Sequence, residues 1–341
     1  MSQEEPEILF GRGHVVDVPD ERDYAVDTVS LREIDTAASH FTIFDPTGPS
    51  YQQIVFNQFS AGTCTCNAVA SAYMYELQRQ KVPIGDYRPS RLFLYYVARY
   101  ARIYDKDIKP TDIPTAEYYK GLMNNVPTVP LLDDSGSQVR DVIKIMGSLG
   151  APQELEIFKP ADYAKYRPGS GTWPYDRFAE PVKDKFKDQD WPAKAPDSSC
   201  YKKEVLHTVL NYSRPELTVD SWKACIKNGY PVMFGFKWYE PTMSNFFYGK
   251  RSKNYKYVVP VPDTTKEKQD GGHAVLAVGW NDKVNIGDGK EPVGCFRVQN
   301  SWGWQWGDEG YYWMPYKFLR KQGNVMLVND PWTLMQGTPN A

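Results

Sequence analysis

The chain has 341 residues, 41% hydrophobic and 24% charged, which allows one large domain or two lobes with hydrophobic cores. Its 42 acidic and 40 basic side chains nearly cancel, so charge gives no support for a nucleic-acid or membrane partner. The start, MSQEEPEILFGRG, lacks the features of a signal peptide, and no apolar run could cross a bilayer. Five cysteines argue against a disulfide framework, so we expect a reducing compartment, cytoplasmic or virion interior.

The first predicted elements are an arm and a long helix. Residues 1–50 are rich in Asp, Pro and turn formers, which predicts an extended arm that must lie against the rest of the chain. From Thr63 to about Lys81 apolar residues recur at helical spacing without Pro or Gly. This pattern predicts a helix with Cys64 in its first turn, and Ser60 and Thr63 are candidate caps.

More helices and then strands follow. Helices are predicted at 89–103, across 133–150 and at 219–228, from apolar spacing and end signals. Residues 152–203 are rich in Pro, Lys and Asp, which indicates a solvated connection. Short segments rich in Val and aromatic residues, bounded by Gly, Asp and Asn, predict strands at 230–238, 256–262, 273–280, 294–302 and 310–316.

This order of elements predicts an α+β protein with two lobes and a cleft where they meet. We expect residues 51–205 to form a mainly helical lobe. Residues 206–341 are expected to form a mainly β lobe, with the arm of residues 1–50 outside both.

Cys64 and Cys66 lie one residue apart, and they could form part of a metal site, a redox pair, or one nucleophile beside one packing residue. A thiol in the first turn of a helix lies among free N–H groups, which lower its pKa and favour the nucleophilic thiolate. A metal site needs further ligands nearby in sequence, and a redox pair usually has two residues between its cysteines, so both are disfavoured. We expect no metal and no cofactor. Positions two apart on a helix point about 200° apart, so Cys64 and Cys66 cannot face one partner.

His273 is the candidate partner of the thiol. It follows two glycines and opens the most apolar strand of the second half. The other histidines, His14, His40 and His207, lie in polar segments and are expected to be surface or packing residues, with His40 in a coil.

The segment NSWGWQWGDEGY supplies a third element. The amide of Asn300 can orient an ionising imidazole without adding a charge. The indole of Trp302 can cover that contact and exclude water.

Three segments, NQFSAGTC, GGHAVLAVGW and QNSWGWQWGDEGYYWM, together resemble the papain-like cysteine peptidases and occur in that family's order. The segments DVPDERDY, SRLFLYY, GSQVRDVIKIMGSLGAP, WPYD and NGYPVMFGF extend the resemblance to the bacterial and viral branch, from about Gly13 to Tyr316. The resemblance implies a papain-like two-lobed fold: a helical left lobe with the nucleophile helix, an antiparallel β-barrel-like right lobe and a cleft between them. It also implies a hydrolase that acts on polypeptide substrates.

The same resemblance implies roles for individual residues. Cys64 would be the nucleophile and His273 the general acid and base. Asn300 would orient His273, Trp302 would shield that contact, and Gln58 would join the Cys64 backbone N–H in the oxyanion hole.

It also implies a set of residues that contact the substrate, with Trp306 on the leaving-group side: Ser135, Gly136, Ser137, Gly272 and Trp306. Met233 and Gly235 in YPVMFGF would leave an apolar recess for a side chain.

Departures from the family pattern lie around the nucleophile. Ala61 replaces a half-cystine, and Thr65 replaces a tryptophan. Aligned by CNA, Cys66 would be the nucleophile, whereas Gln58 and the Gly-Thr pair favour Cys64, which leaves Cys66 as a small packing residue. About fifty residues precede Gln58, where secreted members carry a long helical prodomain.

The arm therefore has two interpretations. It packs across or beside the cleft and restrains activity, as in a zymogen, or it adds an edge strand to the β lobe.

Two alternatives in function keep the fold: a thiol amidase or acyl transferase, and a non-catalytic binding module. The presence of Gln58, Cys64, His273 and Asn300 together disfavours the binding module.

Overall fold

The computed structural model describes residues 12–17, 38–43, 55–83, 85, 87–104, 132–157, 172–176, 196, 198–201, 208–249, 257–286 and 290–338. The helices in these ranges are α1 (Cys64–Arg79), α2 (Arg91–Tyr104), α4 (Val139–Ser148), α5 (Val219–Lys227) and α6 (Thr242–Phe247), with 3-10 turns η3 (Ser198–Tyr201) and η5 (Tyr316–Leu319). The strands are β1 (His40–Thr42), β2 (Gln153–Ile157), β3 (Thr172–Asp176), β4 (Thr208–Ser213), β5 (Val232–Glu240), β6 (Lys268–Val284), β7 (Val293–Gln299), β8 (Tyr311–Pro315) and β9 (Val328–Thr338).

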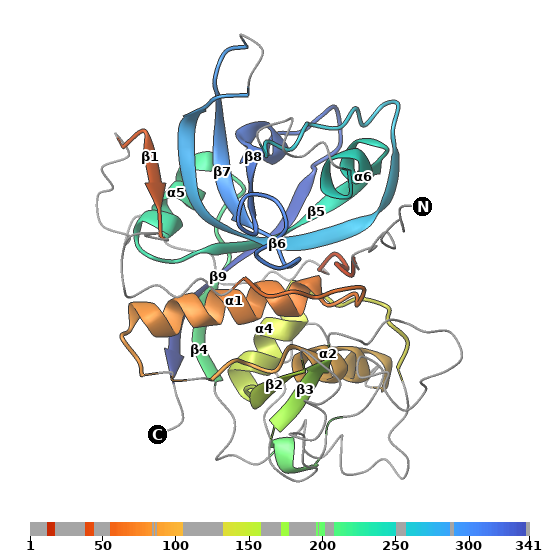
Figure 1. Cartoon of the computed structure of the whole chain (residues 1–341), viewed down its shortest axis with the longest axis vertical. Helices are drawn as coiled ribbons and strands as arrows, with labels where there is room; N and C mark the ends of the chain where they lie inside the picture. Colours follow the sequence, from red (N-terminus) through yellow and green to blue (C-terminus); the bar gives the residue numbers. More distant parts are fainter. Residues whose placement is uncertain are drawn as a thin grey trace, which may run out of the picture.

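Two layers are visible in Figure 1, and they confirm the predicted α+β class. Most of the larger sheet, with α5 and α6, lies above α1, α2 and α4, whereas β4 lies beside α4 in the lower half of the view. Its strand order is β4-β9-β5-β6-β7-β8, with all pairs antiparallel. The sheet is open rather than barrel-like, because β4 packs against α4 instead of joining β8 at the other edge.

Part of the arm forms β1, which pairs with β6. His40 lies opposite Asn281 and Thr42 opposite Gly279, where β6 extends beyond its pairing with β5. A Cβ on Gly279 would lie 2.6 Å from the Phe41 carbonyl oxygen, so only glycine permits this close approach. The added edge strand is therefore present, and the expectation of a coil at His40 is wrong.

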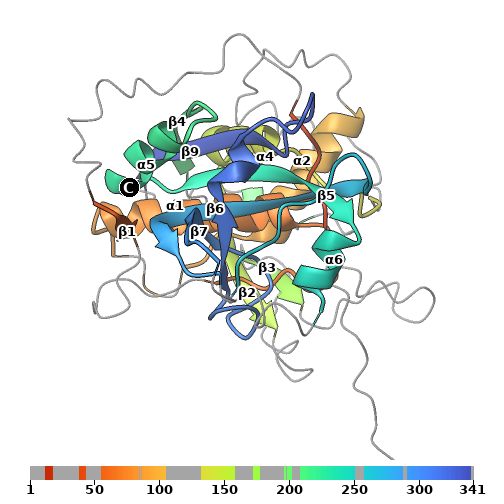
Figure 2. The same ribbon diagram turned by 90° about the horizontal axis from the view of Figure 1, so that it is seen from above.

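Helix α1 is buried on all sides, and its sequence accordingly has no continuous polar face. Every residue from Cys64 through Leu77 is buried, since β5, β6 and β9 cover one side and α2 and α4 the other (Figures 1 and 2). The predicted start is confirmed, but the predicted cap is wrong for Thr63. Its side chain makes no bond to the helix amides and instead accepts from Asn67 Nδ2 at 3.0 Å.

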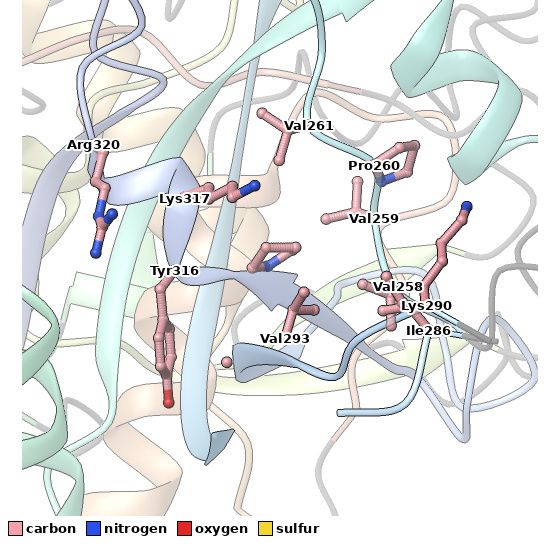
Figure 3. Close-up of a pocket in the computed structure, with 12 residues that line it drawn as sticks. Val258, Val259, Pro260, Val261, Ile286, Lys290, Val293, Tyr316, Lys317 and Arg320 are labelled. Carbon is pink, nitrogen blue, oxygen red and sulfur yellow. The ribbon is translucent and has the colours of Figure 1, made fainter. Parts of the chain in front are cut away.

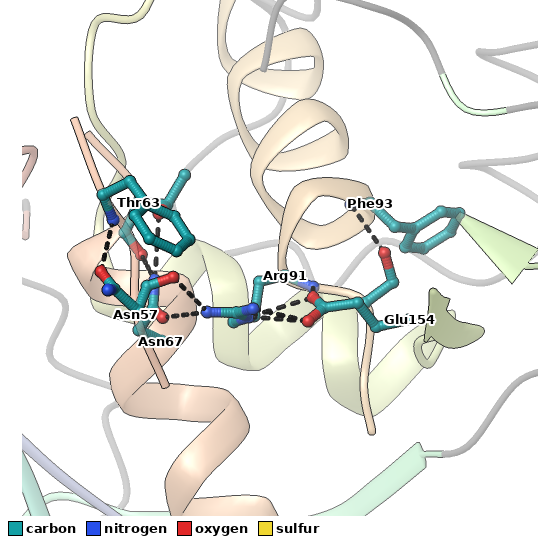
Figure 4. Close-up of polar contacts among 8 residues, drawn as sticks. Asn57, Thr63, Asn67, Arg91, Phe93 and Glu154 are labelled. Atoms are coloured by element: carbon teal, nitrogen blue, oxygen red, sulfur yellow. Dashed lines mark hydrogen bonds and ion pairs between the residues drawn. The ribbon is translucent and has the colours of Figure 1, made fainter. Parts of the chain in front are cut away.

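An ion pair inside the helical layer holds the start of α1 (Figure 4). Arg91 Nη2 donates to Glu154 Oε1 at 2.6 Å, and both side chains are buried. Arg91 Nη1 also donates to Asn67 Oδ1 at 2.7 Å and to the Asn57 carbonyl at 3.0 Å. One guanidinium thus joins α2, β2, the first turn of α1 and the segment before it, so that each donor has an acceptor.

Two predictions fail in the described ranges. Residues 257–262 form no strand, because Pro260 and Pro262 have no amide to donate, and only an isolated bridge joins Val258 to Trp313. The stretch 152–203 is more than a connection, since β2 and β3 pair in parallel and η3 follows. Most of that stretch and His207 lie outside the described residues.

All five cysteines are free thiols, and all are buried. No helix of the described ranges has the length and apolar character that a membrane span requires.

Candidate active site

Cys64 is the first residue of α1, and its thiol is fully buried. Burial raises the pKa of the thiol to about 11, while backbone hydrogen bonds from Ala274, Gly13 and Thr65 act to lower it. The sulfur is therefore in contact with its own helix, with β6 directly after His273, and with the arm.

His273 lies on β6 and is held by Asn300 beyond the end of β7. The two atoms His273 Nε2 and Asn300 Oδ1 are 2.8 Å apart. Because an amide oxygen only accepts, Nε2 carries the proton and Nδ1 presents its lone pair when the ring is neutral. Nδ1 is buried and has no hydrogen-bond partner in the described ranges. Burial lowers the pKa of His273 to about 4, against the opposing effect of the Asn300 hydrogen bond.

Aromatic rings enclose this imidazole. The Trp302 ring centroid lies 5.3 Å from that of His273, and Trp302 is 1% exposed. Phe247 contacts both rings edge-on. Trp306 stacks on Phe247 at 5.6 Å and donates from Nε1 to its carbonyl at 2.9 Å. The His273–Asn300 bond thus lies in a dry, low-dielectric setting that strengthens it.

The Gln58 amide is fixed at both ends. Nε2 donates to the Ala61 carbonyl at 2.8 Å, and Oε1 accepts from the Ser301 hydroxyl. The Gln58 backbone N–H donates to the Ser301 carbonyl at 2.8 Å. Sequence reasoning missed Ser301, although its position directly after Asn300 was a signal.

The turn at 135–137 is joined to the loop before the nucleophile. Asp134 accepts from the Gly62 N–H at 2.9 Å and from the Tyr95 hydroxyl. Tyr95 in turn accepts from the Gly136 N–H at 2.9 Å. Asp134 therefore fixes the distance between Cys64 and the predicted substrate-binding turn, a role that no sequence pattern indicated.

Residues 12–17 of the arm lie between the predicted substrate-binding turn at 135–137 and Gly272, the residue before His273. The His14 N–H bonds to the Gly272 carbonyl at 3.4 Å, and the Val15 N–H donates to the Ser137 carbonyl at 3.0 Å. Ser137 N–H returns a bond to the Gly13 carbonyl at 2.8 Å. The predicted substrate-binding backbone is thus paired with residues 12–17, which agrees with the expected position of the arm at the cleft, while its restraint of activity stays a prediction.

Gly13 makes the closest approach. A Cβ on Gly13 would lie 1.7 Å from the Gly62 carbonyl oxygen, and a Cβ on Gly136 would lie 2.3 Å from the Gly13 carbonyl oxygen. Both positions therefore require glycine while the arm is docked. Arg12 anchors the other side: its Nη1 donates to the Asp270 carbonyl at 2.8 Å, and its guanidinium lies 4.6 Å from the Trp238 ring.

Cys66 lies in a different environment from Cys64. Its thiol is fully buried, 3.9 Å from Ser137 Oγ, and burial raises its pKa to about 12. The described residues contain no group of three His, Cys, Asp or Glu side chains that could hold a metal ion.

A separate hollow of about 430 Å³ lies elsewhere in the β layer (Figure 3). It shares no residue with the site around Cys64. Its lining is mainly apolar, with three cationic side chains: Val258, Val259, Pro260, Val261, Ile286, Val293, Pro315, Tyr316, Lys290, Lys317 and Arg320.

Comparisons with known proteins agree with this geometry. Residues 169–326 match the family described as papain family cysteine protease. An "uncharacterized peptidase C1-like protein" of Acanthamoeba polyphaga mimivirus is 28% identical over 286 residues, 83% of this chain and 70% of that protein.

Solved structures give the same result. Xylellain, a cysteine protease from Xylella fastidiosa, is 26% identical with a TM-score of 0.63, over 98% of this chain and 99% of that chain. Procathepsin B from Trypanosoma congolense has the same fold at 13% identity, with a TM-score of 0.56 over 97% of this chain and 87% of that chain. Fold and matches together define a cysteine-type peptidase, a hydrolase of peptide bonds. The chain is thus similar to the papain family of cysteine proteases in sequence and in fold.

Proposed function

We propose that Cys64 and His273 form the catalytic pair of this peptidase, oriented by Asn300. The observation that carries the proposal is the 2.8 Å contact between His273 Nε2 and Asn300 Oδ1. It leaves Nδ1 as the nitrogen for proton transfer, and the backbone of the next residue, Ala274, is close enough to the Cys64 thiol to act on its pKa.

The reaction proceeds through an acyl-enzyme. The Cys64 thiolate attacks the carbonyl carbon of the peptide, and the oxyanion is stabilised by the Cys64 backbone N–H and Gln58 Nε2. The C–N bond breaks as the His273 imidazolium protonates the leaving amine. His273 then takes a proton from water, which attacks the thioester and regenerates the thiol. Trp302 keeps the His273–Asn300 bond dry.

We also propose that residues 12–17 restrain activity while they are docked. A peptide bond set for attack presents its carbonyl carbon to the sulfur, whereas the docked arm presents the Gly13 N–H. Burial holds the pKa of the Cys64 thiol at about 11 and that of His273 at about 4. At neutral pH both groups are therefore uncharged, and the thiolate–imidazolium pair that catalysis needs does not form.

Further expectations belong to this proposal. A polypeptide substrate occupies the backbone sites on Ser135–Ser137 and Gly272 once the arm has left, with Trp306 beside the leaving group. The division into residues 1–50, 51–205 and 206–341 and the cytoplasmic or virion location remain predictions.

The proposal is tested by mass spectrometry after treatment with a thiol-directed peptidase inhibitor. We expect one label, which disappears in Cys64→Ala and remains in Cys66→Ala. A label that survives Cys64→Ala contradicts the assignment. Labelling without cleavage of any peptide in a mixed library would favour the thiol amidase or acyl transferase alternative.

A further inference from the structure

A recess beside the candidate catalytic pair holds the imidazole of His14. Two glycines form its walls: a Cβ on Gly235 of β5 would lie 2.0 Å from His14 Cε1, and one on Gly272 of β6 would lie 3.1 Å from Nδ1. The His14 side chain is 1% exposed. Because neither wall carries a side chain, the recess has room for the His14 ring.

The floor of the recess is a carboxylate, not the apolar surface that was expected. Asp330 of β9 is 2% exposed, and its Oδ2 lies 3.2 Å from His14 Nε2. The same oxygen accepts from the Asp17 N–H at 2.9 Å. Both partners of Oδ2 thus belong to the arm.

The backbone of β9 aims this carboxylate into the recess. Gly235 pairs with Asn329, whereas Met233 pairs with Trp332, so β9 holds one extra residue between these pairs. Such a bulge turns a side chain out of the regular alternation of a strand. Asp330 also has φ of +50°, a left-handed conformation that costs energy outside glycine and that often occurs at functional sites.

The contact of Arg214 with Asp330 leaves the recess side of the carboxylate open. Arg214 Nη2 lies 3.6 Å from Oδ1, beyond hydrogen-bond length, and its side chain is 30% exposed. Arg214 therefore offsets part of the negative charge of Asp330 from the Oδ1 side. The other oxygen, Oδ2, faces His14. When the arm leaves, Oδ2 loses both of these donors and is open to a new donor that enters the recess.

We propose that this recess is a side-chain subsite of the cleft and that Asp330 makes it select substrates with Lys, Arg or His at one position. This inference rests on the proposed function, because the arm lies on the backbone groups assigned to the substrate. His14 is the side chain of this class that the structure places there. An apolar side chain would fill the same space and leave Asp330 Oδ2 without a donor.

The first experiment uses the full chain with Gly13→Val, since a side chain at this position clashes with Gly62 and prevents docking of the arm. Peptide libraries are varied at each position on the amino side of the cleaved bond. We expect Lys, Arg or His to exceed Leu by about tenfold or more in kcat/KM at one position. In Asp330→Asn this ratio collapses toward one, whereas Glu291→Gln, an exposed acid outside the cleft, leaves it unchanged. An equal rate for Lys and Leu at every position overturns the proposal.

The second experiment needs no peptidase activity. His14 is replaced by Lys, Arg, Gln or Leu in the full chain, and the rate of Cys64 alkylation by iodoacetamide reports how long the arm is undocked. We expect Lys and Arg to keep alkylation as slow as His, and Leu to accelerate it about tenfold or more. Asp330→Asn should remove the difference between Lys and Leu.

The two experiments distinguish failure of the proposed subsite from failure of the proposed peptidase function. If peptides are cleaved without preference for a cation and the substitutions at position 14 are equivalent, the subsite is wrong and the proposed function stands. If no peptide is cleaved but the order at position 14 depends on Asp330, the peptidase mechanism fails and the cation site stands.

Discussion

The backbone of Gly13 lies beside the Cys64 thiol and acts to lower its pKa, so the arm lies against the sulfur proposed to attack peptides. The contact is possible because Gly13 lacks a side chain: a Cβ there would lie 1.7 Å from the Gly62 carbonyl oxygen. We therefore expect access to Cys64 to depend on whether residues 12–17 are docked.

Gly13→Val is expected to release the arm and raise the rate of Cys64 alkylation by about tenfold or more. Val16→Ala is the matched control, since Val16 is 50% exposed and its contacts to the cleft run through its backbone. Alkylation is followed by mass spectrometry of the peptide that contains Cys64. Equal rates in Gly13→Val and the unmodified chain would show that the arm does not limit access.

The pH dependence of alkylation should change with the arm. Burial raises the pKa of Cys64 to about 11, so the rate in the unmodified chain should keep rising with pH toward that value. In Gly13→Val, water and the imidazolium of His273 stabilise the thiolate, and the rate should level off several pH units lower. Identical profiles would contradict a role of the arm in holding the thiol protonated.

Asp17 should make docking of the arm weaker above neutral pH. Burial, with a smaller effect of Asp330, raises its pKa from 3.8 to about 7 when docked. The docked form therefore binds the proton more tightly, so this contribution to stability is full below about pH 4 and is lost as pH rises through about 7. Thermal unfolding at pH 5 to 8 should show a fall that Asp17→Asn lacks.

The Asp17→Asn chain should also be less stable at every pH. Asp17 accepts from Trp332 Nε1 at 2.8 Å and from the Arg140 N–H at 3.3 Å, and an amide cannot accept at both positions. An identical slope in the two chains would assign the pH dependence to another group.

Gln58→Ala is expected to lower kcat by about 10²- to 10³-fold with little change in KM, as for the loss of one oxyanion donor. Ser301→Ala should give a smaller loss of the same kind, because Ser301 only holds the Gln58 amide oxygen. Both are measured in the Gly13→Val chain with peptide substrates. A change in KM alone would place Gln58 in substrate binding instead.

Arg91→Met should destabilise the fold by about 3–5 kcal/mol, because Glu154 would be left as a buried, unpaired charge. Urea unfolding measures this loss. The double change with Glu154→Leu should recover part of it, but not all, since Asn57 and Asn67 still lose a donor. A double variant as unstable as the single one would contradict this explanation.

The elements nearest to Cys64 could be predicted because each carries a local signal. The helix at 64–79 follows from uninterrupted apolar spacing, and the strand of His273 from an apolar run after two glycines. By contrast, the strand predicted at 256–262 failed because the Val pattern was given more weight than Pro260 and Pro262.

Asp330 could not be predicted from the sequence. In VNDPW an Asp before Pro reads as a turn, and the recess above it is formed by β5, β6 and β9 together with the arm. No spacing along the chain encodes the meeting of four segments. His14 lay in an Asp-rich stretch and was expected to be unremarkable for the same reason.

The strand β1 has a kinetic consequence. Residues 40–42 pair with β6 through contacts separate from those of residues 12–17, so we expect the arm to stay attached near the cleft when residues 12–17 undock. A segment attached to the same chain rebinds in a unimolecular step, whose rate does not depend on the protein concentration. If the proposed restraint holds, a peptide substrate would compete with an inhibitor on the same chain, and a cut between the two contacts would make activation lasting.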